Sequence, residues 1–183
     1  MAIFVEEGSP KTLDGRSEAE LSAYAYLDAL GVPYTRADHE AAATMEDCES
    51  IGQALDCHVC KNLFLTNRQG TAFYLLLMPA DKPFKTKELS SQINSARLSF
   101  ASPERMKELL GTYPGAATVL GLMHDKEKAV SLLIDEDLLS EPYLGVHPLV
   151  NTSMLRIETQ ALLSLFLKKT GHSYRTVHLV GDE

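Results

Sequence analysis

The sequence lacks the segments that would carry a chain into or across a membrane. No run approaches the ~20 consecutive apolar residues that a membrane-spanning helix needs. The amino-terminal segment Met1–Glu7 becomes acidic early and has no basic start, so it does not have the pattern of a secretory signal. We therefore expect no membrane partner and a cytoplasmic location.

The chain also lacks a convincing metal-binding pattern. Its three cysteines, Cys48, Cys57 and Cys60, are an odd number and suggest no disulfide framework. Cys57 and Cys60 have the spacing of half a zinc site, but a second pair is missing and the motif leads into a strand. The six histidines show no pairwise spacing on one helix. We expect neither a metal nor another cofactor.

Familiar catalytic and phosphate-binding motifs are missing as well: the sequence has no glycine-rich phosphate loop, no G-x-S-x-G and no H-E-x-x-H. The formal net charge of -8 argues against a broad nucleic-acid binder, which usually carries a basic stripe. It is compatible with an enzyme that grips only the end of an RNA. One local basic segment, Asp81–Lys87, holds three lysines and is followed by Arg97, Arg105 and Lys107. Its simplest interpretation is a solvated face.

What remains is the pattern of a folded domain. With 183 residues, 45% hydrophobic and 23% charged, the chain suits one domain over residues 1–183. Residues 1–15 are rich in turn formers and are predicted to be a loose amino-terminal arm. Helical and hairpin patterns interleave without strict alternation, which predicts an α+β fold with a mixed β-sheet.

The first helix is predicted to begin at the capping box of Ser17 and Glu20 and to end at Gly31. Periodicity predicts further helices over residues 44–55, 85–93, 102–110 and 159–169, with a helical turn at 136–139. It predicts strands over residues 32–36, 62–66, 71–78, 98–100, 117–122, 129–135, 153–157 and 176–179.

Two polar signatures interrupt this pattern. The first is Cys60-Lys61-Asn62-Leu63-Phe64-Leu65, in which Lys61 stands just before an apolar strand. Its ammonium is either solvated at the start of the strand or held at a binding site. Asn62 falls on the opposite face of the strand, where it is either part of a site or a local backbone cap.

The second signature is Gly145-Val146-His147-Pro148-Leu149-Val150-Asn151-Thr152. Pro148 keeps His147 extended, which suits a side chain presented from a loop, although a surface histidine fits equally well. Gly145 can supply unusual backbone angles and an exposed amide. Asn151 and Thr152 fit either a site or a turn that enters a strand.

No local motif of the sequence indicates a catalytic nucleophile, which suits a substrate that is already activated. An aminoacyl ester is such a substrate, because a positioned water and a few hydrogen-bond donors suffice for its hydrolysis. A lysine, an asparagine and loop amides would supply the donors.

The two signatures, together with Arg97–Ser102 and Tyr113-Pro114-Gly115, occur in the order seen in free-standing homologues of the prolyl-tRNA synthetase insertion domain. Over roughly residues 17–180 the sequence resembles the YbaK-like editing superfamily, and most of all its alanyl-tRNA(Pro) deacylase branch (ProXp-ala, PrdX). The resemblance implies a mixed, barrel-like sheet flanked by helices, and no metal. It also implies catalytic roles for Lys61, His147 and Gly145 and substrate-binding roles for Asn62, Pro148, Asn151 and Thr152.

The function implied by this resemblance is removal of alanine from mischarged tRNA(Pro). The expected partners are the acceptor end of tRNA(Pro) and, as a second candidate, prolyl-tRNA synthetase. A proline pocket rejects the smaller alanine weakly, because a missing methylene is worth only ~1–3 kcal/mol. The wall of an alanine pocket should be apolar, with candidates that core packing explains equally well: Leu63, Phe64, Leu120, Leu122 and Met123.

Two rival interpretations stay open beside alanine editing. Val119–Asp125 does not reproduce the Gly-x-Ser-Pro stretch of the YbaK branch, which argues against cysteine and favours alanine. A deacylase for cysteinyl-, seryl- or threonyl-tRNA is nevertheless consistent with the sequence. So is a non-catalytic module that binds tRNA or a synthetase.

Overall fold

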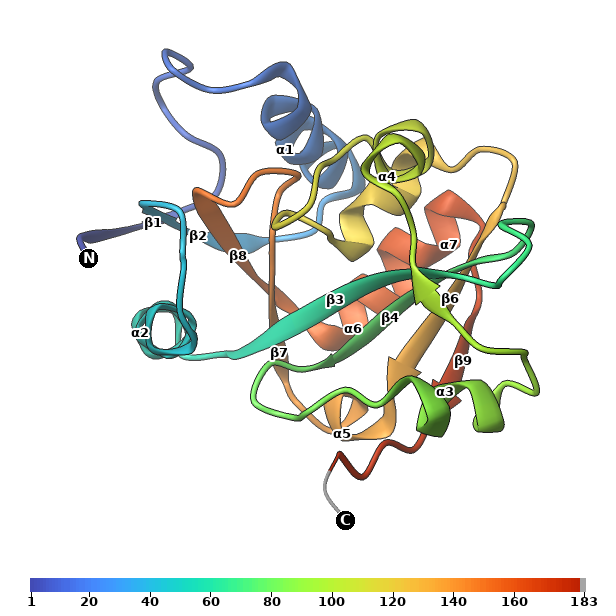
Figure 1. Ribbon diagram of the computed structural model, residues 1–183. Coiled ribbons are helices and arrows are strands. Elements are labelled where there is room, and N and C mark those ends of the chain that lie inside the picture. The colour runs from blue at the N-terminus through green and yellow to red at the C-terminus, as the bar shows by residue number, and fades with distance from the viewer. Residues whose placement is uncertain (182–183) are drawn as a thin grey trace.

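The computed structural model describes residues 1–181, and its centre is a mixed sheet of nine strands flanked by helices (Figure 1). The strands are β1 (Ile3–Glu7), β2 (Tyr34–His39), β3 (His58–Thr66), β4 (Phe73–Pro79), β5 (Ser99–Phe100), β6 (Val130–Asp135), β7 (Tyr143–Val146), β8 (Ser153–Glu158) and β9 (Tyr174–Val177). The predicted α+β class with a mixed sheet is therefore confirmed.

The sheet consists of two halves that meet at β3. The strand order is β1-β2-β8-β7-β3-β4-β6-β9, and the short β5 pairs with β3. One half, β1-β2-β8-β7, is antiparallel throughout. In the other half β3 and β4 are antiparallel, whereas β6 is parallel to both β4 and β9. Between the halves, β3 and β7 run parallel.

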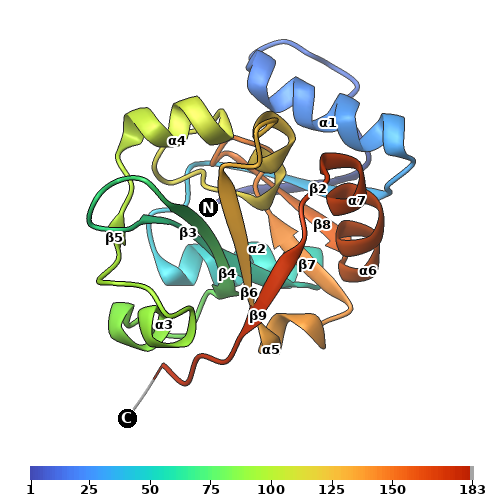
Figure 2. The same cartoon turned by 90° about the vertical axis from the view of Figure 1, so that its right-hand side faces the viewer.

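Helices cover both faces of this sheet (Figure 2). They are α1 (Glu18–Leu30), α2 (Met45–Leu55), α3 (Thr86–Gln92), α4 (Pro103–Leu110), the 3₁₀ helix η1 (Val119–His124), α5 (Glu136–Leu139) and the continuous run α6 (Thr159–Ala161), η2 (Leu162–Phe166, a π-helix) and α7 (Leu167–Thr170). Among these helices, none in residues 1–181 has both the length and the apolar character that a bilayer span requires.

Three clusters of buried side chains follow from this layering. The main core packs Leu27 of α1, Leu110 of α4 and Phe166 of η2 against the sheet. On the opposite face, Leu89 of α3 belongs to a second cluster and Ile51 of α2 to a third. Because β4 contributes to both the main and the second cluster, it is buried on both faces, as its continuous apolar run predicted.

The amino-terminal arm was predicted to be loose, and this is wrong for residues 3–7. They form β1, which pairs antiparallel with β2 from Ile3 opposite His39 to Glu7 opposite Thr35. Most side chains of β1 are exposed, so no hydrophobic alternation announced the strand. An ion pair between Glu6 and the buried Arg36, at 2.7 Å, helps to hold β1 on the sheet.

The strand predicted over residues 117–122 is also wrong, because residues 119–124 form the 3₁₀ helix η1. Its residues 119–123 are all buried, and a short apolar run that is buried on every side has no period to distinguish a strand from a helix. Gly121 brings η1 close to α4, since a Cβ there would lie 2.8 Å from the Cβ of Leu110. Strand β7 was not predicted, and β9 lies two residues earlier than the predicted final strand.

Candidate functional site

Strands β3 and β7 separate immediately after a short parallel contact. His58 lies opposite Leu144 and Val59 opposite Gly145, and within residues 1–181 the two strands pair no further. Two residues farther along each chain come Lys61 and His147, so the register brings both to the point of separation. Crevices at the carboxyl ends of neighbouring parallel strands are where open α/β sheets bind ligands. We call this place the fork.

Lys61 is the fourth residue of β3 rather than the residue at its entrance, and it is half-buried. Its Nζ donates a hydrogen bond to the carbonyl oxygen of Lys82 at 2.6 Å. Burial lowers the pKa of Lys61, whereas the charge of Asp81 opposes this shift. An ammonium group carries three N–H donors, so two remain for a ligand.

The carbonyl that binds Lys61 belongs to a residue that is itself firmly held. The Nζ of Lys82 lies 2.7 Å from Oδ2 of Asp135, 2.7 Å from Oδ2 of Asp137 and 2.7 Å from the carbonyl oxygen of Leu179. Asp135 is fully buried. The position of Lys61 therefore depends on an ion cluster that joins β6, α5 and the segment after β9.

His147 is held by its own loop. Its Nδ1 lies 2.9 Å from the carbonyl oxygen of Ser153, and because a carbonyl can only accept, Nδ1 carries the proton. Burial lowers the pKa of His147, which favours the neutral ring. In that ring Nε2 is an acceptor. His147 can therefore hold a water or a hydroxyl group at the fork.

The loop after His147 is pinned by the segment that follows α4. The hydroxyl of Thr112 donates to the carbonyl of Leu149 at 3.2 Å. The hydroxyl of Tyr113 donates to Oδ1 of Asn151 at 3.0 Å and accepts from the Asn151 amide at 3.1 Å. Leu149 is buried at a φ of 66°, a conformation that is a genuine outlier for a bulky side chain. Such strain persists where the surroundings impose it.

Three further residues predicted for the site lie along this loop. Pro148 is buried within it, whereas Thr152 is exposed and its carbonyl accepts the amide of His39 at 3.0 Å. Gly145 is not in a left-handed conformation, so the expectation of unusual backbone angles there is wrong; Leu149 has them instead. The reason for a glycine is space. A Cβ at Gly145 would lie 3.2 Å from Sγ of Cys57.

Asn62 lies across the strand from Lys61. Its Oδ1 accepts the amide of Val119 at 3.1 Å, and its Nδ2 donates to the carbonyl of Cys60 at 3.3 Å. The side chain therefore anchors the start of η1 to β3. The structure brings Lys61, Gly145 and His147 to the fork and gives Asn62 a supporting position behind it.

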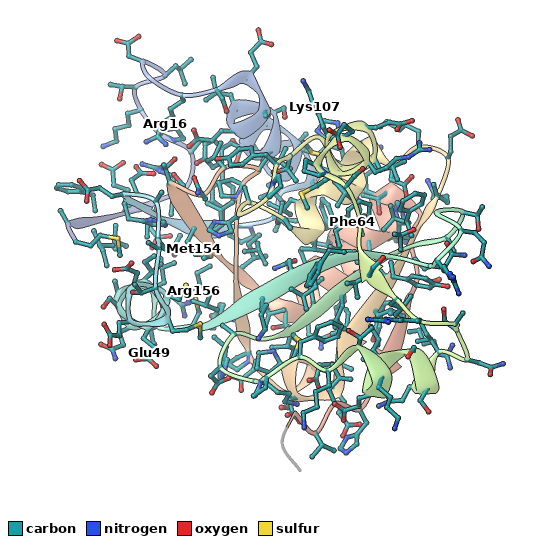
Figure 3. All side chains as sticks on the ribbon, in the orientation of Figure 1. Arg16, Glu49, Phe64, Lys107, Met154 and Arg156 are labelled. Carbon is teal, nitrogen blue, oxygen red and sulfur yellow. The ribbon has the colours of Figure 1, made fainter. Side chains whose placement is uncertain are left out.

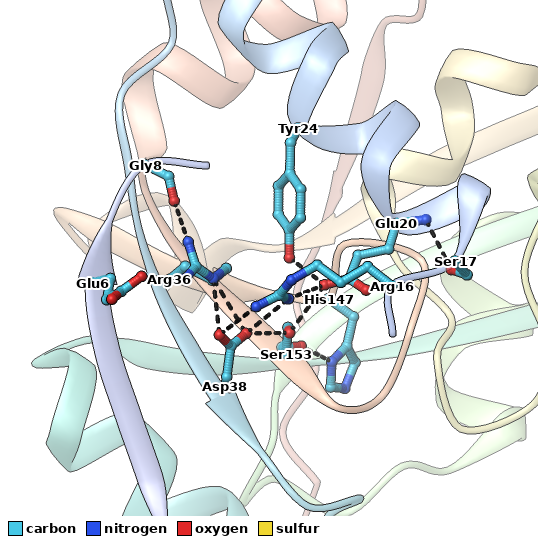
Figure 4. Close-up of polar contacts among 10 residues, drawn as sticks. All are labelled: Glu6, Gly8, Arg16, Ser17, Glu20, Tyr24, Arg36, Asp38, His147 and Ser153. Carbon is cyan, nitrogen blue, oxygen red and sulfur yellow. Dashed lines mark hydrogen bonds and ion pairs between the residues drawn. The ribbon is translucent and has the colours of Figure 1, made fainter. Parts of the chain in front are cut away.

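Behind His147 lies a network of charged residues that the sequence did not reveal (Figure 4). Ser153 donates its hydroxyl to Asp38 at 2.7 Å, and Asp38 also receives Arg16 at 2.7 Å and Arg36 at 3.1 Å. Burial opposes ionisation of Asp38, but these hydrogen bonds outweigh it and lower its pKa to about 2. The available signal was Arg36 at the end of the strand predicted over residues 32–36, with Asp38 two residues later.

Next to the fork lies a cavity of about 570 Å³. It is lined by α2, the start of β3, Ala80, Asp81, Tyr143 and Arg156. Lys61 and His147 do not line it, but Val59 and Asp81 do. The cavity thus lies at the amino-terminal ends of β3 and β7, and its lining approaches Lys61 through Val59, two residues earlier on β3, and Asp81, whose charge acts on Lys61.

One wall of this cavity is a stacked pair. The guanidinium carbon of Arg156 lies 3.7 Å from the centre of the Tyr143 ring. The Nε of Arg156 is buried and has no hydrogen-bond partner among the described residues. Figure 3 shows Arg156 with Met154 and Glu49 on the α2 side of the sheet. An arginine inside the apolar run of β8 was the sequence signal that this wall offered.

The five apolar residues considered as walls of an alanine pocket pack in the hydrophobic core instead. Phe64, Leu120, Leu122 and Met123 belong to the main core, and Leu63 packs against the second cluster. None of the five lines the cavity. Core packing is therefore their role.

The two cysteines of the C-x-x-C spacing diverge. Cys60 packs in the main core, whereas Cys57 packs with the third cluster on the other face. Burial raises the pKa of both thiols, that of Cys57 to about 11. In residues 1–181 no group of three or more histidine, cysteine, aspartate or glutamate side chains is arranged to hold a metal ion.

Comparison with known proteins places this geometry in a family. Residues 39–165 match the profile of the "Aminoacyl-tRNA editing domain". The prolyl-tRNA editing protein ProX of Acetoanaerobium sticklandii is 29% identical over 162 residues, which are 88% of this chain and 98% of that protein. A prolyl-tRNA synthetase associated domain-containing protein of Xenopus laevis is 32% identical over 158 residues, 84% of this chain and 93% of the relative.

A solved structure shares the fold. It is described as a candidate trans-editing enzyme for prolyl tRNA synthetase, with a TM-score of 0.68 and 21% identity over 89% of this chain and 97% of that one. The expected editing-domain resemblance is confirmed by the sequence matches, and the fold by this structure.

The depressed pKa of Asp38 generates a prediction about acid stability. The contribution of a carboxylate with a lowered pKa is present above its unfolded pKa of ~3.9 and is lost as the pH falls toward the folded value of about 2. Asp38→Asn removes this ionisation. We expect the gap in unfolding free energy between wild type and Asp38→Asn to narrow between pH 5 and pH 2. Urea unfolding across this range measures the gap, and a constant gap would contradict the assignment.

Proposed function

The chain belongs to the aminoacyl-tRNA editing domain family, and we propose that it acts in trans as a deacylase that removes alanine from mischarged tRNA(Pro). The observation that carries this proposal is Lys61 at the fork, with two free donors beside a cavity of about 570 Å³. The name of the relative ProX supports prolyl-tRNA as the substrate class. Prolyl-tRNA synthetase is the second partner that we propose.

The proposed reaction is hydrolysis of the ester that joins the amino acid to the terminal ribose. Water forms a bond to the ester carbonyl carbon, and the bond from that carbon to the ribose oxygen breaks. One proton of the water ends on the ribose oxygen, so that the products are the free amino acid and the uncharged tRNA. Donors aimed at the developing oxyanion lower the barrier of such a step.

The residues at the fork would share this work. Lys61 would donate to the ester carbonyl or to the terminal phosphate with the two N–H groups that Lys82 leaves free. His147 would accept from the attacking water, or from the ribose hydroxyl beside the ester, through Nε2. Gly145 would allow the close approach of the strands. Asn62, Pro148, Asn151 and Thr152 would maintain the positions of η1 and the loop.

The cavity beside Lys61 would receive the aminoacyl group. Four acidic residues line it, Glu49, Asp56, Asp81 and Glu141, and they suit the positive α-amino group of an aminoacyl ester. Because the cavity is also partly polar, serine or threonine remains a rival substrate to alanine. A module that only binds tRNA is disfavoured by the free donors of Lys61 and the acceptor Nε2 of His147, which follow the parallel contact of β3 and β7.

The first test is a panel of aminoacyl-tRNA(Pro) substrates. We expect hydrolysis of alanyl-tRNA(Pro) and sparing of prolyl-tRNA(Pro), the preference that the resemblance to alanyl-tRNA(Pro) deacylases implies. Deacylation of alanyl-, cysteinyl-, seryl- and prolyl-tRNA(Pro) at equal enzyme concentration measures the preference. Equal rates on all four substrates would contradict a preference for alanine. Hydrolysis of none of them would leave the binding module as the function.

The second test concerns the fork itself. Lys61→Met keeps the aliphatic stem but removes the ammonium, so we expect the single-turnover rate to fall on the order of a hundredfold, the cost of misplacing the reacting groups. His147→Ala should lower the rate less, because a water can be held in other ways. Lys168→Met, an exposed lysine of α7, is the matched control and should behave as wild type.

Thermal melting on the same preparations separates chemistry from folding. The hydrogen bond of Lys61 to Lys82 is worth about 1 kcal/mol net, so Lys61→Met should remain folded. A wild-type rate from Lys61→Met would refute the assignment of Lys61. A loss of folding would make Lys61 structural.

The third test concerns metal independence, which we propose because the cysteines diverge to opposite faces of the sheet. Dialysis against a strong chelator should leave the rate of alanyl-tRNA(Pro) hydrolysis unchanged. Loss of activity that zinc restores would show that metal ligands were overlooked.

A further inference from the structure

An aromatic side chain projects from the sheet on the same face as Lys61. Phe100 of β5 is 65% exposed, and β5 pairs with β3 so that Phe100 lies opposite Leu65. Lys61 and Leu65 are four residues apart on β3 and therefore point to the same face, about 13 Å from each other at ~3.3 Å per residue. In Figure 2, β5 lies at the margin of the molecule between α3 and α4.

A second series of contacts connects Lys61 and Phe100. Lys61 is bonded to the carbonyl of Lys82, and two residues later Phe84 packs edge-on against Phe100, with the ring centres 6.4 Å apart. The segment 82–84 therefore extends from the ammonium group to the exposed ring. The cavity lies on the other side of Lys61, toward Val59, so that cavity, lysine and ring follow one another along β3.

Cationic residues lie close in sequence to Phe84 and Phe100, in a chain whose net charge is -8. Lys85 follows Phe84, and Arg97 precedes Phe100 by three residues; both are exposed, as is Lys87 in the first turn of α3. Within residues 1–181 none of the three is in an ion pair, whereas Arg105 farther along is paired with Glu108. Three exposed cations without ion pairs, on the segments that carry Phe84 and Phe100, are not explained by the core or by the fork.

We propose that Phe100, together with Lys85, Lys87 and Arg97, is a docking platform for the single-stranded end of the tRNA acceptor arm. The nucleotides that bind there are those that precede the terminal adenosine. Proteins bind single-stranded RNA by stacking bases on aromatic rings and by placing cations along the phosphates. A docked protein is disfavoured, because lysines are depleted at the centres of protein interfaces. The platform rests on the proposed function, since it orients the ester toward Lys61.

The test compares two substrates, one of which ends before the platform. Alanyl-tRNA(Pro) spans from Lys61 to Phe100, whereas 3′-O-alanyl-adenosine contains only the ester and the terminal nucleoside. We expect Phe100→Ala to lower kcat/KM on the tRNA at least about fivefold more than on alanyl-adenosine, mainly through KM, because one stacked base is lost. Phe100→Trp should restore the tRNA value.

The matched control is Phe4→Ala, because Phe4 on β1 is 69% exposed but lies in the other half of the sheet. It should match wild type on both substrates. Equal losses on both substrates for Phe100→Ala, or the same loss for Phe4→Ala, would overturn the platform.

A binding measurement keeps the platform separable from the activity. Fluorescence anisotropy with an uncharged RNA hairpin that carries a single-stranded ACCA-3′ end should show at least about fivefold weaker binding for Phe100→Ala. Lys85→Ala should also reduce the slope of log K against log salt by about 0.7, while Lys168→Ala should not.

Weaker RNA binding by Phe100→Ala in a protein that hydrolyses none of the substrates would uphold the platform and refute the activity. Active enzyme with binding unaffected by Phe100→Ala would refute the platform alone. Loss of binding to prolyl-tRNA synthetase with unchanged RNA binding would identify a protein surface instead and overturn the proposal.

Discussion

Two residues of parallel pairing between β3 and β7 determine the arrangement of this protein. His58 with Leu144 and Val59 with Gly145 are the pairs through which the two halves of the sheet meet in the described chain. Because each strand then continues with a different partner, the two strands separate where the pairing stops. A side chain at Gly145 would crowd this contact, since its Cβ would lie 3.2 Å from Sγ of Cys57. The close approach of the two strands thus favours a glycine at this position.

The two polar residues at the fork are supported by separate ion clusters on different parts of the fold. Lys61 is bonded to the carbonyl of Lys82, whose ammonium is surrounded by Asp135, Asp137 and the carbonyl of Leu179. His147 is bonded to the carbonyl of Ser153, whose hydroxyl reaches Asp38. Buried ion pairs are weak contributors to stability, so their presence here is better explained by positioning. A site held by such supports is preorganised for its ligand.

The sequence predicted the fold class, most elements and the two polar residues at the fork, because these have local signals. Caps and apolar periods depend on neighbours in the chain, and Lys61 and His147 interrupt such periods. The 3₁₀ helix was mistaken for a strand because its residues are buried on every side. The cavity with Arg156 and the cluster around Asp38 combine residues from distant segments. No local pattern contains that information, and only the strand register brings these residues together.

The support of Lys61 also orders events during synthesis. Lys82 lies 97 residues before Leu179, whose carbonyl completes its shell. A ribosome adds roughly 5–20 residues per second, and amino-terminal parts fold first. Contacts between residues so far apart in the sequence form late, because closing a long loop costs conformational entropy. A nascent chain would therefore expose strand β3 and its lysine for several seconds without the groups that fix them. The support of Lys61 is complete only when Asp135, Asp137 and Leu179 are in place.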